Sequence, residues 1–214
     1  MIENLEEQID VIKKSLRSFY LSFQFNGVIK KMGNCFKITI GKTPPTKERK
    51  WFTNDSRAGI KWLSIKDMKD NGDYIFSTSK HLTSQAQSEF NIPLVQKGDI
   101  LLSFKLTLGR VGISTLNMIT NEAIACFKYD QTYMSYLYCF LSNYNFEKKI
   151  ESTSSIGKAF NSSILKNLDF LYPFKSNVMA FNEISFPLLN SILNLREKQE
   201  KLKKVKTYLL QKYF

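Results

Sequence analysis

The sequence contains a single histidine, His81, and only three cysteines, Cys35, Cys126 and Cys139. A zinc centre or a Ser-His-Asp triad needs more of these side chains, and no two of the cysteines form a Cys-x-x-Cys pair. We therefore predict that His81 is a polar loop residue rather than a catalyst and that the three cysteines are buried thiols. No metal site is expected.

The sequence motifs of common catalytic sites are missing as well. There is no Gly-x-x-x-x-Gly-Lys-Ser/Thr loop, no Gly-x-Gly-x-x-Gly turn after a strand, and no Asn-Pro-Pro-Tyr or Phe-x-Gly-x-Gly signature of a methyltransferase. The Glu-x-Lys element of many nucleases occurs at Glu48 to Lys50 and at Glu147 to Lys149, but a lysine-rich chain produces such matches by chance. We expect no catalytic activity in this chain.

Long apolar runs are also absent. No segment approaches the roughly 18 apolar residues of a membrane span. The first residues include Glu3, Glu6 and Glu7, where a signal peptide has a basic region. We therefore expect a cytoplasmic protein that does not enter a membrane.

Positive charge is what the sequence has in excess. The 31 Lys and Arg residues outnumber the 19 Asp and Glu residues, which gives a net charge of +12. Between residues 30 and 50 the only acid is Glu48, so this segment is a basic patch. Such a patch favours nucleic acid as the partner, because each neutralised phosphate releases counterions. The alternative is a lysine-rich surface that is merely solvated.

Two segments with helical periodicity enclose the rest of the chain. In residues 1–23 the apolar side chains recur at alternating steps of three and four, which is typical of the seam of a supercoiled helix, and Gly27 is expected to end that helix. In residues 181–214 a second seam follows Pro187, a residue that suits the first turn of a helix. The predicted pairing residues are Ile2, Leu5, Ile9, Ile12, Leu16, Phe19, Leu188, Ile192, Leu195, Leu202 and Leu209.

A lone amphipathic helix cannot bury its apolar stripe, so each of these two helices needs a partner. We predict that they pack against each other as an antiparallel pair. Packing on another copy or on a partner protein is an alternative. A further alternative is that both are ordinary helices lying on the core of the central body.

The central body, residues 24–180, combines strand and helix patterns broken by Gly, Pro and Asn clusters. We interpret it as an α+β domain, a mixed α/β body with long helices at both ends of the chain. Strands are expected at residues 35–40, 60–65, 99–104 and 123–127, a helix over 133–151, and a mixed apolar run at 164–171.

The stretch from Leu94 to Ser103, continued from Thr107 to Ile113, looks like the central part of the recognition domains of type I restriction-modification specificity subunits. Gly98 would turn the chain into a buried strand, and Gly109 and Gly112 would allow a tight return. Further segments that resemble this family, in matching order, are Gly41 to Pro45, Trp62 to Met68, Thr153 to Asn161, Leu202 to Phe214 and, as a second copy of the helix end, Ile9 to Phe23.

The resemblance implies a target-recognition domain at residues 24–180 between spacer helices at 1–23 and 181–214. Such a subunit is not catalytic: it reads the bases of one half of a bipartite site in double-stranded DNA, and its paired helices set the gap between the halves. Its partners would be modification subunits, which bind S-adenosylmethionine and methylate adenine, and a restriction subunit. No cofactor is therefore expected in this chain.

A full-length subunit of this family has two recognition domains and two spacer helices, so this sequence resembles one half. It would be either a naturally short protein or part of a longer gene. The half could form a homodimer through its helices and read a symmetric split site, or it could pair with a different half-subunit.

Candidate DNA contacts lie in polar loops next to the predicted strands. Lysine and arginine side chains around the Pro44-Pro45 turn are expected to contact phosphates, and polar residues of later loops are expected to contact base edges. The predicted phosphate contacts are Lys42, Lys47, Arg49, Lys50 and Arg57. The predicted base contacts are Lys80, His81, Lys105, Thr107, Ser155, Lys158 and Asn161.

Two other functions fit the composition. An RNA-binding protein would use the positive charge together with Tyr and Phe stacking, but the aromatic residues gather in apolar runs such as Tyr133 to Phe140, which is typical of a core. A non-catalytic interaction scaffold is the second alternative. Its binding would depend weakly on salt, whereas a DNA reader loses affinity steeply as salt rises.

Overall fold

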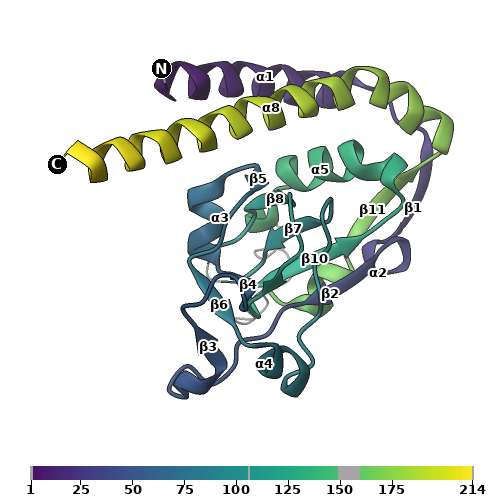
Figure 1. Cartoon of the computed structure of the whole chain (residues 1–214). Helices are drawn as coiled ribbons and strands as arrows, with labels where there is room; N and C mark the ends of the chain where they lie inside the picture. The colour runs from purple at the N-terminus through teal and green to yellow at the C-terminus, as the bar shows by residue number, and fades with distance from the viewer. Residues whose placement is uncertain (1, 106, 149–159, 214) are drawn as a thin grey trace.

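The structure, a computed structural model, describes residues 2–105, 107–148 and 160–213. A mixed body of strands and short helices lies beneath two long helices (Figure 1). The helices are α1 (Ile2–Ser22), α2 (Met32–Cys35), α3 (Ile65–Asn71), α4 (Ser84–Glu89), α5 (Met134–Asn143), α7 (Ser162–Lys166) and α8 (Lys175–Tyr213), with 3₁₀ turns η1 (Arg49–Trp51) and η2 (Gln131–Tyr133). The predicted α+β class is confirmed.

The described strands form three sheets. The largest has the order β2-β10-β7-β8-β5, a second has the order β3-β6-β4-β9, and β1 pairs with β11 alone. The strands are β1 (Gly27–Lys31), β2 (Lys37–Ile40), β3 (Phe52–Thr53), β4 (Ile60–Leu63), β5 (Tyr74–Ile75), β6 (Lys80–Leu82), β7 (Ile100–Ser103), β8 (Val111–Ser114), β9 (Ile119–Thr120), β10 (Ile124–Lys128) and β11 (Asp169–Pro173).

The largest sheet is buried on both faces, which explains why β7 is a continuous apolar run. Alternate side chains of a strand point to opposite faces. Ile100 and Leu102 join the main core beneath the long helices, whereas Leu101 joins a second cluster with Leu63 and Met68. Strands buried on both sides are apolar at every position rather than at every second one.

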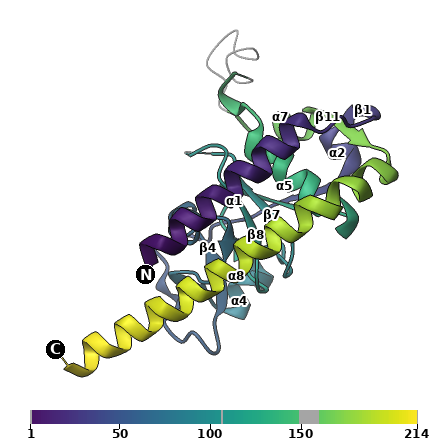
Figure 2. The same cartoon turned by 90° about the horizontal axis from the view of Figure 1, so that it is seen from above.

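The two long helices run antiparallel, as predicted. Phe19 of α1 stacks on Phe181 of α8 with ring centroids 5.1 Å apart, while at the other end Glu6 bonds Arg196 at 2.5 Å. Figures 1 and 2 show α1 along the first two thirds of α8, and the last turns of α8 extend beyond it. Both helices also bury residues in the main core of the body, so the alternative of packing on the body is correct as well.

The predicted start of the second helix was wrong. We expected Pro187 in the first turn, but α8 begins at Lys175 and continues through Pro187 for 39 residues. A proline inside a helix costs about 3 kcal/mol because it removes one backbone hydrogen bond. The buried side chains of Phe181 and Leu189 lie on either side of this position, and each contributes about 1.5–3 kcal/mol, so packing outweighs the defect.

The predicted pairing residues differ in burial. Ile2, Ile12, Phe19, Leu188, Leu195 and Leu202 are half-buried, and Leu5, Ile9, Leu16 and Ile192 are buried. Leu209, in contrast, is 46% exposed, because it lies on the part of α8 beyond the beginning of α1.

Gly27 does not end α1, which stops at Ser22, but opens β1 opposite Pro173. A Cβ at Gly27 would lie 2.2 Å from the carbonyl oxygen of Tyr172, so only glycine fits between the two strands. The expected turns at Gly98 and Gly109 are confirmed by their positive φ angles of 91° and 87°.

The four predicted strands are confirmed: β2, β4 and β7 are shorter than expected, and β10 is shifted by one residue to Ile124–Lys128. The helix expected over 133–151 is shorter: α5 ends at Asn143, because Tyr144 adopts an extended conformation. The mixed run at 164–171 divides between α7 and β11. Within the described residues no helix is long and apolar enough to cross a membrane.

Candidate nucleic-acid interface

A pocket of about 420 Å³ on the smaller mixed sheet brings together three of the predicted contacts, Arg49, Lys80 and His81. Arg49 belongs to η1. The prediction that Lys80 and His81 lie in a loop was wrong, because both belong to β6, which pairs with β3 and β4. The remaining lining residues are Thr46, Phe52, Thr53, Asn54 and Ser79. The pocket therefore combines cationic, hydroxyl, amide and imidazole groups around one aromatic ring, which suits contacts to phosphates and to base edges.

Strand pairing and a small aromatic core hold this pocket in place. β3 pairs with β6 so that Thr53 lies opposite His81. Beneath the strands, the buried rings of Trp51 and Trp62 pack with Leu82 in a separate apolar cluster. Because the cluster fixes η1 and β6 from below, it positions their polar side chains at the surface.

The cations of the pocket are available for an anionic ligand. Lys80 Nζ lies 5.9 Å from the ring centroid of Phe52 and 6.0 Å from that of Trp62. Among the described residues, no Asp or Glu forms an ion pair with Arg49 or Lys80. A phosphate group would supply the missing counter-charge.

The other four predicted phosphate contacts are exposed and lie before, within or after η1 and β3. Lys42 Nζ donates to the carbonyl oxygen of Phe90 at 2.8 Å, and the side chain of Lys50 pairs with Glu48 at 3.1 Å. The exposed residues Lys47 and Arg57 complete this group. Lys42 and Lys50 would have to exchange these contacts for a phosphate.

The predicted base contacts outside the pocket lie on other segments. Lys105 is exposed and Thr107 half-buried, both on the turn between β7 and β8, where the Thr107 amide donates to the Lys105 carbonyl at 2.7 Å. Asn161 caps α7, its side-chain oxygen accepting hydrogen bonds from the amides of Ser163 and Ile164. Ser155 and Lys158 lie outside the described residues. All of these remain predictions.

Sequence reasoning missed five residues of the pocket. Asn54 follows the apolar residues Trp51 and Phe52, a pattern that marks the end of a short strand. Thr46 and Ser79 carry no comparable signal, because they reach the pocket only through the pairing of β3 with β6.

The cysteines and acids give no sign of a reactive or metal centre. Cys126 and Cys139 are buried as predicted, but Cys35 is only half-buried, because it ends the short surface helix α2. Burial, with a smaller contribution from Asp99, raises the pKa of the Cys126 thiol to about 12, so this thiol stays protonated. In the part of the chain that the structure describes, no three His, Cys, Asp or Glu side chains are placed to bind a metal.

Comparison with known proteins decides the family. A model of the type I restriction modification DNA specificity domain matches residues 28–204, from β1 to the later turns of α8. The chain belongs to this family. We call its central body, residues 24–180, the recognition domain, which carries the pocket lined by Arg49, Lys80 and His81.

Relatives of this specificity domain are longer than the chain. The type I restriction enzyme MjaIX specificity subunit of Methanocaldococcus jannaschii is 24% identical over 192 residues, which cover 87% of this chain and 43% of the relative. Among solved structures, the HsdS subunit from Thermoanaerobacter tengcongensis matches 98% of this chain and 52% of its own, with a TM-score of 0.58 and 15% identity. The S subunit of the type I system from M. genitalium matches 100% and 56%, with a TM-score of 0.62 and 15% identity. The chain thus spans about half the length of these proteins and shares their fold.

Proposed function

We propose that this chain recognises one half of a bipartite sequence in double-stranded DNA for a type I restriction-modification complex. The family match over residues 28–204 carries the proposal. The pocket with Arg49, Lys80 and His81 supports it, because its lining suits the phosphates and base edges of DNA. In this arrangement Arg49 would position the backbone, and Lys80 and His81 would read bases.

We assign the chemistry to partner subunits. A modification subunit would bind S-adenosylmethionine and methylate adenine, and a restriction subunit would cleave the DNA. This chain would recognise the DNA sequence and hold no cofactor. The relative described as a type I restriction enzyme specificity subunit supports this division of roles. Because the target is genomic DNA, the complex would act in the cytoplasm.

We further propose that a second copy of the chain covers the end of α8. From Lys203 to Tyr213 every residue is exposed, including Val205 and Leu209, which line a shallow apolar pocket with Ile2 and Leu202. An apolar helix face of this kind needs a partner. An equivalent helix from a different half-subunit would fit the same face.

Charge complementarity favours the second copy. The end of α8 carries Lys203, Lys204, Lys206 and Lys212, and the beginning of α1 carries exposed Glu3, Glu7 and Asp10. If two α8 ends packed antiparallel across a twofold axis, each basic end would reach the acidic beginning of the other copy's α1. Such a dimer would place two recognition domains at opposite ends of one helical rod and would read a symmetric split site.

Methylation mapping tests the proposed recognition. The candidate modification subunit is expressed in a host with this chain and without it, and adenine methylation is mapped over the genome by long-read sequencing. We expect a split adenine-methylated motif only when the chain is present, and a symmetric motif if the chain acts as a homodimer. A stable complex with the modification subunit that methylates no motif would contradict the recognition role.

A further inference from the structure

Polar contacts tie α8 to the recognition domain at three positions that are seven residues apart, Asn182, Leu189 and Arg196. The Asn182 amide donates to the carbonyl oxygen of Thr132 at 2.8 Å, and the hydroxyl of Tyr74 donates to the carbonyl oxygen of Leu189 at 3.0 Å. Seven residues are close to two helical turns, so all three contacts lie on one face of α8 over about 21 Å.

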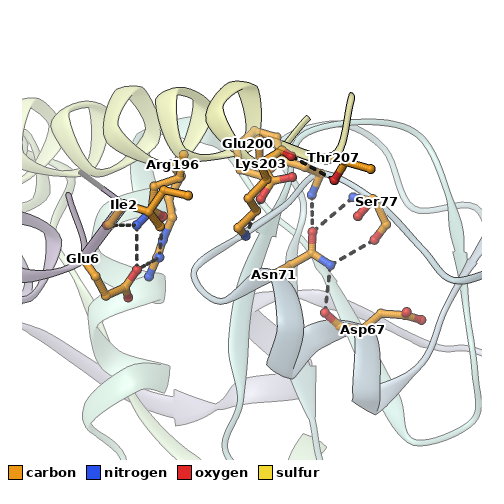
Figure 3. A network of polar contacts seen from close by, with 11 residues as sticks. Ile2, Glu6, Asp67, Asn71, Ser77, Arg196, Glu200, Lys203 and Thr207 are labelled. Carbon is orange, nitrogen blue, oxygen red and sulfur yellow. Dashed lines mark hydrogen bonds and ion pairs between the residues drawn. The ribbon is translucent and has the colours of Figure 1, made fainter. Parts of the chain in front are cut away.

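Arg196 joins three parts of the molecule. Its Nη1 bonds Glu6 of α1 at 2.5 Å, and its Nη2 bonds Asp73 of the recognition domain at 3.0 Å. The Arg196 side chain is only 12% exposed. Figure 3 shows Arg196 reaching down from α8 beside Glu6. One guanidinium group therefore connects both long helices to the domain.

Asp73 receives two further contacts, both at its Oδ1 atom. Lys13 of α1 forms an ion pair with it at 2.8 Å, and the buried hydroxyl of Tyr138 in α5 donates to it at 2.9 Å. The Asp73 side chain is 9% exposed. A buried carboxylate with three partners has one favourable position, because losing any partner leaves charge or polar groups unpaired.

The turn that contains Asp73 is connected through α3 to the pocket lined by Arg49, Lys80 and His81. Asn71 bonds the backbone of Ser77 and of Asp67, as Figure 3 shows, and so fixes the turn that contains Asp73. At the other end of α3 the Asp67 carboxylate accepts a hydrogen bond from the amide of Ser79, which lines the pocket. The polar contacts of Asp67 and Asn71, the backbone from Asn71 to Asp73 and the bonds of Asp73 thus connect the pocket to the helix pair.

We infer that Arg196 and Asp73 are positioning residues that fix the angle of the recognition domain about the helix pair and thereby the spacer length between the two half-sites. This inference rests on the proposed function, since spacer length has meaning only for a split site. The domain cannot rotate about α8 without breaking the contacts of Arg196, because they engage α1 and the domain at once.

Pulsed electron paramagnetic resonance tests the positioning without DNA. Spin labels are placed on exposed Gln85 of α4 and exposed Asn194 of α8, in a Cys35→Ser background diluted with unlabelled protein. Arg196→Lys keeps the charge but lacks the planar fork whose two nitrogens bond Glu6 and Asp73, so we expect a broader or shifted distance distribution. Ser191→Ala, which removes one exposed contact within α8, is the matched control and should leave the distribution unchanged.

Methylation mapping of the same variants tests the spacer length. With Arg196→Lys we expect the half-site sequence of the unmodified chain together with loss of its single spacer length. An unchanged distance distribution in a folded variant, or an unchanged spacer in spite of a broadened one, would overturn the inference. If the unmodified chain directs no methylation, the proposed function fails, whereas the resonance experiment still decides whether Arg196 and Asp73 fix the domain. Should Arg196→Lys not fold, Tyr74→Phe, which loses only the bond to Leu189, is measured in its place.

Discussion

Phe19 and Phe181 stack face to face, with ring centroids 5.1 Å apart and planes inclined by 1°. The two rings lie near the end of α1 and the start of α8, where the chain enters and leaves the recognition domain, and Phe25 and Phe23 pack around Phe181 at 5.1 and 5.4 Å. This aromatic group connects both long helices to the main core.

Replacing Phe181 by alanine should destabilise the whole chain. Phe181 is fully buried, and removing a buried phenylalanine side chain costs about 3–5 kcal/mol in lost transfer energy and cavity formation. Denaturant unfolding followed by circular dichroism measures the change. Met179→Ala on the same helix is the control, because Met179 is 56% exposed and should change the free energy of unfolding by less than about 1 kcal/mol. Equal effects of the two variants would contradict this packing.

Arg49 and Lys80 should respond differently to substitution. As the proposed phosphate contact, Arg49 should act on any sequence, so Arg49→Ala should weaken binding to specific and scrambled duplexes equally and lower the salt slope by about 1. Lys80→Ala should weaken binding to the specific duplex by about 1–3 kcal/mol more than to the scrambled one. Fluorescence anisotropy at several salt concentrations measures both. Lys198→Ala, on α8 outside the pocket, is the control.

Lys105→Ala tests the turn between β7 and β8 separately from the pocket. As a base contact, Lys105 should contribute about 1–3 kcal/mol to discrimination between the specific and scrambled duplexes. The same titrations measure it. Equal losses on both duplexes would reassign Lys105 to the phosphates.

Leu209→Asp should separate the proposed dimer without unfolding the chain. Leu209 is 46% exposed, so a carboxylate there is solvated in the monomer but is unpaired and buried in a helix interface. Analytical ultracentrifugation should show a dimer for the unmodified chain and a monomer for the variant. Gln211→Asp adds the same charge two residues further on, at a position that does not line the apolar pocket, and should leave the dimer intact. A monomeric unmodified chain would contradict the homodimer and favour pairing with a different half-subunit.

The junction at Asp73 should lose stability in acid. Burial acts to raise the pKa of Asp73, but Lys13 and Arg196 together lower it below its ordinary value of 3.8. A carboxyl group with a lowered pKa stabilises the folded state above its ordinary pKa, and this stability is lost as the pH falls through the folded pKa. At neutral pH, Asp73→Asn should therefore cost about 3–5 kcal/mol, as expected for a broken buried ion pair.

The difference in free energy of unfolding between the unmodified chain and Asp73→Asn should shrink below about pH 4, where Asp73 itself becomes neutral. Urea unfolding between pH 7 and pH 3 measures it. Asp70→Asn, an exposed substitution on α3, should leave the profile unchanged. A difference that stays constant down to pH 3 would show that the charge of Asp73 does not contribute.

How much of the fold could be predicted depended on the length and burial of each element. α1 and β7 were evident because their apolar patterns run through the whole element, every three or four residues in the helix and at every position in the strand. β3, β5 and β9 have two residues each, too few for a pattern, and they exist because partners distant in sequence hold them. The start of α8 was missed because Pro187 is a strong local signal that tertiary packing overrides.

The pocket was predictable only in part, for a similar reason. Arg49, Lys80 and His81 have the charge and polarity of DNA contacts, which residue type alone reveals. That they share one pocket follows from the pairing of Thr53 with His81, and no sequence periodicity reports a pairing over such a separation. Asn161 has a role that its polarity alone did not reveal, since its side-chain oxygen caps α7; its contact with a base stays a prediction.

The pairing of β1 with β11 brings the two ends of the recognition domain next to each other. Gly27 and Pro173 lie opposite each other in an antiparallel ladder, so the chain enters and leaves the domain at neighbouring points, roughly 5 Å apart between Cα atoms. A domain with such adjacent ends can be exchanged for another without changing the path of α1 or α8. An incoming domain would nevertheless need counterparts of Tyr74 and Asp73 to meet α8, so compatibility with Leu189 and Arg196 limits which domains the same helices can carry.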